Sequence, residues 1–186
     1  MWKWERIREL RNNSVLVFFA IAMMLYAVTY AVIGLSSKGN YYSGIVSRFF
    51  DYPYAMRSMV LFISYKILLF FNYQALLVNA EFIYNPHHGG IHMAYSCMGF
   101  GLMALWIAFI ISCKPFNTRR KLLLILLGLV VINAMNILRV LVIFISHNKR
   151  FLGIEHHDLF NMLVHVVVIL MGLLVINGNK HILSGS

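Results

Sequence analysis

Four long apolar runs constrain the fold of this chain more strongly than any other feature. Each run approaches or exceeds the roughly 20 residues that a helix needs to cross the hydrocarbon core of a bilayer. Hydrophobic residues make up 61% of the 186-residue chain and charged residues only 12%, whereas soluble domains carry about twice that share of charge. We therefore predict an all-α integral membrane protein with one membrane domain over residues 1–186. The predicted spans are residues 15–35, 91–113, 122–146 and 159–176.

The positive charges of the chain lie in short clusters that flank the apolar runs. The formal net charge is +10 at pH 7, but no basic face recurs along a helix. This charge therefore indicates topology signals and contacts with lipid head groups rather than nucleic acid. Residues 1–14 lack the cleavage site of a signal peptide and form a predicted amphipathic lead-in. By the positive-inside rule this lead-in and the cation-rich linker Lys114–Lys121 are both predicted to be cytoplasmic.

The stretch between the first two predicted spans contains a further apolar run, residues 58–77. Counting this run as a span would place the cation-rich linker outside the cell. Lys66 also lies in its middle, where a charge is costly in a true span. We therefore expect a helix over residues 58–71 that dips into the membrane or lies on its surface. The alternative is a fifth span with Lys66 facing the interior of the bundle, so the prediction is a bundle of four to five transmembrane helices.

The segment before the second predicted span has the pattern of a β-hairpin. Residues 73–95 are rich in β-branched and aromatic side chains, with a turn signal at Asn85–Gly90 and period-two alternation over residues 91–95. We expect a small hairpin at the outer surface that runs directly into the next helix. The adjacent turn residues His87 and His88 are expected to be solvated, because structural metal sites normally need about four ligands at fixed spacing.

Polar residues interrupt the third predicted span in a regular pattern. Asn133, Asn136 and Arg139 are spaced three residues apart among leucines, isoleucines and valines, which predicts one shared helix face. An arginine inside a span is costly, so it normally points to a partner or a wet cavity and indicates a functional site.

Two further reactive residue types lie near the outer ends of the other predicted spans. Cys97 is followed by Gly99 and Gly101, small residues that allow another backbone to approach closely. His156 and His157 stand where the last span begins. Cysteine, arginine and histidine from three different spans are therefore expected to converge near the outer leaflet.

At these residues the chain resembles the exosortase/archaeosortase family of membrane-embedded cysteine proteases or transpeptidases. The resemblance covers about residues 55–176 and places the family's three motifs at Cys97 in "SCMG", Arg139 in "NILR" and His157 in "HHDLFN". The chain departs from the family pattern at Met98, where the family usually has serine, and at Asn161, where it often has glycine. It is also shorter than many members and resembles a compact subgroup.

Each of these residue types suits one role in acyl transfer. The Cys97 thiolate is the predicted nucleophile, and His157 is the predicted base that takes its proton and returns it to the leaving amine. Arg139, with its rigid fork of donors, suits an oxyanion. Asn136 is expected either to orient Arg139 or to add a donor at the oxyanion. His156 remains an alternative base, and His165 a second one.

The resemblance also implies a location and a substrate class. It places the chain in the bacterial cytoplasmic (inner) membrane with its active site facing the periplasm or cell exterior. The implied substrates are exported proteins that end in a short motif, a transmembrane helix and a basic tail. Water, or an amine of a glycan or lipid, would resolve the thioester, and no cofactor or metal is implied.

Two other functions are compatible with the same residues. One is a non-catalytic membrane assembly subunit that retains the fold, an alternative motivated by Met98. The other is a haem or redox membrane protein that uses His92 and His165, although paired axial ligands at matching depth are needed and this pair fits poorly.

Overall fold

The computed structural model describes residues 2–37, 41–79, 81–86, 89–113, 116–146 and 156–184, with the side chains of residues 2–14, 156–159, 161 and 178–184 outside that description. Most of the chain is helical, as the sequence predicts. The helices are α1 (Trp2–Ser36), α2 (Gly44–Phe49), α3 (Tyr52–Phe70), α4 (Phe100–Ser112), α5 (Thr118–Ile145) and α6 (His156–Ser184), with a 3₁₀ turn, η1 (Tyr95–Met98), before α4.

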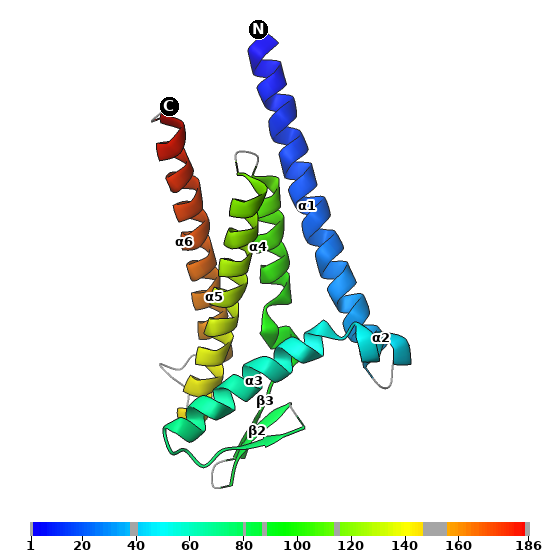
Figure 1. Ribbon diagram of the computed structural model, residues 1–186, viewed down its shortest axis with the longest axis vertical. Coiled ribbons are helices and arrows are strands. Elements are labelled where there is room, and N and C mark those ends of the chain that lie inside the picture. The colour runs from blue at the N-terminus through cyan, green and yellow to red at the C-terminus, as the bar shows by residue number, and fades with distance from the viewer. Residues whose placement is uncertain are drawn as a thin grey trace.

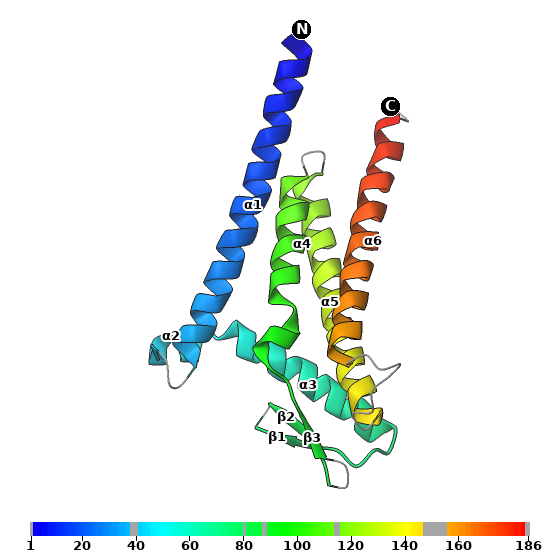
Figure 2. The same cartoon turned by 180° about the vertical axis from the view of Figure 1, so that it is seen from behind.

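The long helices form a bundle that α3 crosses at one end. Figures 1 and 2 show α1, α4, α5 and α6 running alongside one another, with α3 lying across the end of the bundle that is remote from both termini. Along the bundle, α1 packs against α4, α4 against α5, and α5 against α6. The end of α4 and the start of α5 lie at the same end of the bundle as the start of α1, so η1 and the start of α5 are at opposite ends of α4 (Figure 1).

Four helices in the described residues are long and apolar enough to cross a membrane. They are Val15–Ser36 within α1, all of α3, Tyr95–Ser112 and all of α5. The apolar part described for α6, Met162–Asn177, is shorter. The number of such helices agrees with the predicted four to five spans. The whole of α6 runs from His156 to Ser184, and the shorter apolar range Met162–Asn177 covers only its described part.

Helix α3 begins earlier than predicted because its start is well capped. The Asp51 carboxylate accepts a hydrogen bond from the Tyr54 N–H at 3.1 Å, and Pro53 stands in the first turn. Both features stabilise a helix N-terminus, so α3 starts at Tyr52 rather than at Ser58.

The two faces of α3 differ in character. Lys66 is exposed, with its ammonium 5.3 Å from the centroid of the Phe62 ring. Lys66 therefore does not face the interior of this bundle, as the alternative of a fifth span had expected, although α3 is long and apolar enough to cross a membrane. The opposite face is buried against the bundle and the sheet, and it consists of Arg57, Val60, Leu61, Ser64 and Leu68.

The β-element is a three-stranded antiparallel sheet rather than a single hairpin. Its strands are β1 (Leu76–Val78), β2 (Phe82–Asn85) and β3 (Gly89–His92), in that order. The additional pairing of β1 with β2 follows from a turn in which Asn79 has a φ of 52°, a left-handed conformation that asparagine tolerates.

The predicted start of the second span at residue 91 is also wrong. Residues up to His92 belong to β3, and the α-helix begins only at Phe100. Apolar composition alone does not distinguish a buried strand and a 3₁₀ turn from the first turns of a helix.

A tight contact between α4 and α5 gives a stability prediction. The buried Trp106 indole donates to the Leu124 carbonyl at 3.0 Å, and a Cβ built on Gly128 would lie 1.9 Å from its Nε1. Gly128→Ala must therefore displace the indole, and we expect it to lower the free energy of unfolding by about 1–3 kcal/mol. Thermal unfolding in detergent measures this effect.

Gly34 in α1 provides the matched control for that variant, because a Cβ there meets nothing within 4 Å. Gly34→Ala should unfold at or above the temperature of the parent protein, since alanine is the better helix former. Equal unfolding temperatures for Gly128→Ala and the parent would contradict the predicted packing.

Candidate active site

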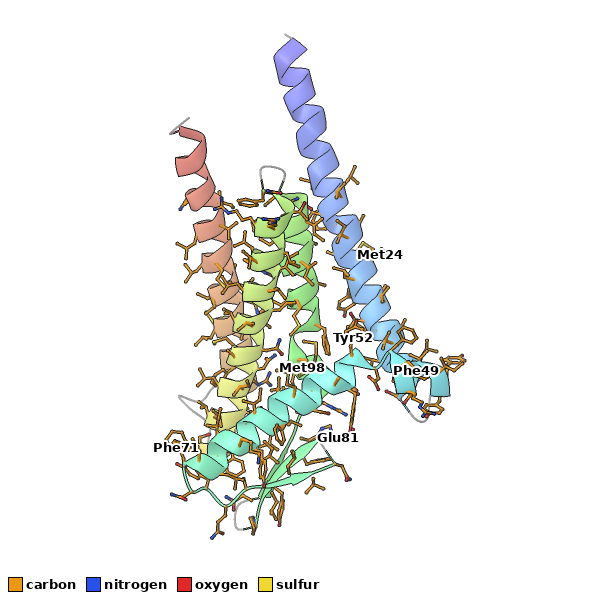
Figure 3. All side chains as sticks on the ribbon, in the orientation of Figure 1. Met24, Phe49, Tyr52, Phe71, Glu81 and Met98 are labelled. Carbon is orange, nitrogen blue, oxygen red and sulfur yellow. The ribbon has the colours of Figure 1, made fainter. Side chains whose placement is uncertain are left out.

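The short turn η1 places Cys97 between the sheet and α4. It leaves β3 through Met93 and Ala94, and the Cys97 N–H donates to the Ala94 carbonyl at 3.0 Å. Cys97 is half-buried, whereas the next side chain, Met98, is fully buried in the core. Figure 3 shows Met98 at the end of the bundle where α3 crosses it.

Gly99 ends this turn for a conformational reason. Its φ is +69°, in the left-handed region, so the chain can leave η1 and enter α4 directly. A Cβ there would have a single neighbour within 4 Å, Ile132 Cγ2 at 3.8 Å, so close approach of another backbone is not what requires glycine. At Gly101 a Cβ would make an ordinary contact with the Tyr26 ring of α1 at 3.5 Å, so neither glycine shows the close backbone approach that was expected.

Two buried polar residues of α5 hold the Cys97 turn. Asn136 and Arg139 are only 4% and 6% exposed. The Asn136 Nδ2 donates to the Met98 carbonyl at 2.9 Å. Arg139 places its Nη2 3.4 Å from the Cys97 Sγ and its Nη1 3.5 Å from the Cys97 carbonyl oxygen. These hydrogen bonds join α5 to a turn that lies 38 to 42 residues earlier in the sequence.

This geometry brings a permanent positive charge to a thiol. The thiolate, and not the thiol, is the nucleophilic form of a cysteine. Arginine carries a rigid fork of N–H donors, and the contacts with Cys97 use its two terminal nitrogens. Because Asn136 bonds to the turn and not to Arg139, it fixes the backbone beside Cys97.

The third polar residue of α5 does not join this group. The Asn133 Nδ2 donates to the Leu129 carbonyl of its own helix at 2.8 Å. Asn133 and Arg139 lie about 120° apart around an α-helix, so the prediction that all three residues share one face was too broad. The buried face of α5 passes instead through Gly128, Ile132, Asn136, Arg139, Val140 and Phe144.

The predicted histidine base stands at the beginning of α6. His156 and His157 form the start of this helix, and α6 packs against α5. The side chains of both histidines lie outside the described residues, so the role of His157 as the base stays a prediction. His165, the other alternative base, is exposed further along α6.

The histidines considered as metal or haem ligands lie partly within the described residues. No group of three or more His, Cys, Asp or Glu side chains that could hold a metal ion occurs in this part of the chain. His87 and His88, the candidates in the turn, lie outside it. Of the proposed haem ligands, His92 is exposed on β3 against the Phe82 ring, with centroids 4.6 Å apart, and His165 is exposed on α6.

The second cysteine has a different environment at the other end of α4. Burial raises the pKa of the Cys113 thiol, and the nearby Lys121 ammonium opposes that rise. A raised pKa leaves less thiolate at neutral pH, so Cys113 is a suitable inert control for Cys97.

One charged residue beside the Cys97 turn was not singled out from the sequence. Arg57 of α3 is 4% exposed and forms an ion pair with Glu81, which follows β1. A signal for it exists in the spacing, because Arg57, Val60, Leu61 and Ser64 follow the repeat of a buried helix face. Lys66 stands out more clearly in the apolar run, but it lies on the exposed face.

Comparison of the chain with protein-family models, with curated proteins and with solved structures finds no match. The function of the protein is therefore inferred from the residues of the site and from the resemblance of its motifs.

Proposed function

We propose that this protein is an exosortase-like membrane cysteine protease or transpeptidase that cleaves the C-terminal sorting signal of exported proteins. One observation carries the proposal, which is the buried Arg139 guanidinium lying 3.4 Å from the Cys97 Sγ. A charge buried among apolar helices is costly unless it has a specific partner. Here that partner is a turn that carries a potential nucleophile.

The proposed reaction is acyl transfer through a thioester. The Cys97 thiolate attacks the scissile carbonyl carbon, and the negative charge that develops on its oxygen is stabilised by the Arg139 guanidinium. Collapse of this intermediate breaks the C–N bond, and the leaving amine takes a proton from His157. Water, or an amine of a glycan or lipid, then attacks the thioester and restores the Cys97 thiol.

The proposed substrate is an exported protein whose C-terminus carries a motif, a transmembrane helix and a basic tail. Its helix would lie beside the bundle, so that the motif meets the Cys97 turn and the basic tail stays on the opposite side of the membrane. Membrane lipids surround the remaining helices in this arrangement.

The buried position of Met98 supports catalysis over the alternative of a non-catalytic assembly subunit. This residue replaces the serine that is usual in the family, and its side chain is 0% exposed, in contact with the core. The Met98 side chain therefore serves core packing, and the backbone of the same residue accepts the Asn136 hydrogen bond.

We propose that α1, α4, α5 and α6 cross the bacterial cytoplasmic (inner) membrane, with α3 and the sheet at its outer surface, facing the periplasm or cell exterior. Tyrosines favour membrane–water interfaces. The exposed large tyrosines near α2, α3 and the sheet are Tyr41, Tyr42, Tyr52, Tyr54, Tyr73 and Tyr84. The cation-rich linker, at the opposite end of α4, would face the cytoplasm.

Labelling with an impermeant thiol reagent tests this orientation in a chain whose own cysteines are replaced by serine. Single cysteines at Ser43 and Asn79, before and after α3, should both label in intact cells. A cysteine at Thr118, in the first turn of α5, should label only after permeabilisation. Labelling of Thr118 from outside would invert the proposed orientation, and labelling of Ser43 and Asn79 from opposite faces would make α3 a true span.

Co-expression with a candidate substrate tests the reaction itself. A suitable substrate is an exported protein, encoded near this gene, that ends in a motif, a hydrophobic helix and a basic tail. Processing shortens it and removes the tail, which mass spectrometry of the new C-terminus detects. An active protein whose Cys97 is unreactive towards alkylating reagents at neutral pH would contradict the proposed nucleophile.

A further inference from the structure

A second buried arginine, earlier in the sequence than Arg139, also contacts the Cys97 turn. The Arg57 side chain comes from the buried face of α3. Its guanidinium carbon lies 4.2 Å from the centroid of the Tyr95 ring, and Tyr95 is the first residue of η1. Arg57 also forms an ion pair with the Glu81 carboxylate, and its guanidinium carbon lies 5.5 Å from the centroid of the Tyr54 ring on its own helix.

The backbone of Glu81 belongs to the same assembly. Its N–H donates to the Val78 carbonyl at 3.2 Å, and its carbonyl accepts from the Met93 N–H at 3.1 Å. Met93 is buried and immediately precedes the entry into η1. Arg57 therefore joins α3, the turn after β1, and the chain on both sides of Ala94.

Two interactions of the buried Arg57 guanidinium stabilise the arrangement of α3, Glu81 and Tyr95. A guanidinium that is 4% exposed requires a partner, and Glu81 supplies the opposite charge. The face of an aromatic ring attracts a cation more strongly when the pair is removed from water. Tyr95 stands two residues before Cys97 in the same four-residue turn, so a contact that holds its ring also restrains the backbone that carries the Cys97 Sγ.

We propose that Arg57 is a positioning residue, which with Glu81 and Tyr95 holds the Cys97 thiol against the Arg139 guanidinium. Asn136 and Arg139 fix the turn from α5, and Arg57 fixes it from α3. The consequence for catalysis rests on the proposed function, whereas the consequence for the reactivity of the Cys97 thiol does not.

Alkylation of Cys97 by iodoacetamide at neutral pH tests this role without a substrate. All variants are made in a Cys113→Ser background, so that Cys97 is the only thiol. Tyr95→Leu removes the aromatic face and should slow alkylation about tenfold, because the cation–π contact is lost and the sulfur moves away from Arg139. Tyr95→Phe keeps the face and should react within about twofold of the parent.

Charge variants separate the cluster from general effects of charge on α3. Glu81→Gln removes the ion pair and should slow alkylation in the same direction as Tyr95→Leu. Lys66→Met removes a cation from the exposed face of the same helix and should leave the rate unchanged. Unfolding temperatures are recorded for each variant, and Tyr95→Phe and Glu81→Gln, which change few atoms, preserve the test if Tyr95→Leu does not fold.

A Tyr95→Leu or Glu81→Gln protein that is folded and alkylated as fast as the parent, or faster, overturns the proposal. Equal slowing by Tyr95→Phe and Tyr95→Leu would show that the ring face is not the contact that matters, and also overturns it. In the processing assay, a positioning role predicts that Tyr95→Leu lowers kcat and leaves KM nearly unchanged. If processing is never observed but the alkylation rates follow the prediction, the proposed function fails and the positioning role stands.

Discussion

Replacing Cys97 by serine is expected to abolish substrate processing while the fold and substrate association survive. A hydroxyl is far less ionised than a thiol at neutral pH, and a neighbouring guanidinium does not supply the strong base that serine would need. The fold should survive, because the hydrogen bonds from Asn136 and Arg139 to the backbone carbonyls of Met98 and Cys97 do not involve the sulfur. Processing of the co-expressed substrate, followed by mass spectrometry of its C-terminus, measures the loss.

Cys113→Ser is the matched control for this experiment. Cys113 lies at the other end of α4, where burial raises the pKa of its thiol. Its replacement should leave processing at the parent level. Continued processing by Cys97→Ser, with the parent's cleavage position, would mean that Cys97 is not the nucleophile.

The helices were predictable from sequence because each apolar run has a bilayer's length. For α5 the predicted range 122–146 agrees well with the observed Thr118–Ile145. The helix that follows Cys97 was predicted to begin too early, since the glycine that fixes its true start acts through backbone conformation. Gly99 has a φ of +69°, and the hydrophobicity of neighbouring residues carries no information about that angle.

The position of α3 was partly predictable. A span over residues 58–77 would have placed the cation-rich linker outside the cell, so a helix that does not run along the bundle was expected. In the structure α3 lies across the end of the bundle (Figure 2). The buried face of α3 could not be predicted, because it is determined by contacts with residues distant in sequence. Arg57 is buried because Glu81 and Tyr95, both distant in sequence, supply its partners, whereas Lys66 is exposed. A sequence identifies a charge inside an apolar run but not its partner.

In the candidate site, too, the residues could be predicted from the sequence but their contacts could not. Cys97, Asn136 and Arg139 were singled out from sequence because reactive or polar residues are rare in apolar runs. The pairing of Asn136 with the Met98 carbonyl, and not with Arg139, depends on where η1 meets α5. Asn133 looked equivalent by spacing, but its amide bonds to the Leu129 carbonyl of its own helix.

Arg139→Lys is expected to slow cleavage about 10²–10³-fold, because loss of one oxyanion donor usually has an effect of this size. Lysine retains the positive charge but lacks the planar fork that places one nitrogen near the Cys97 Sγ and the other near its carbonyl. Substrate association should survive, because the transmembrane helix of the substrate supplies most of the contact. Co-purification of the substrate, measured beside the cleavage rate, separates binding from chemistry.

Asn133→Ala provides the control for Arg139→Lys on the same helix. It removes a polar side chain whose described hydrogen bond is local to α5, so cleavage should stay close to the parent rate. If Arg139→Lys cleaves at the parent rate, the oxyanion role is wrong. If Arg139→Lys no longer retains the substrate, Arg139 is a recognition residue, and the buried polar pair of α5 must be reassigned from catalysis to substrate binding.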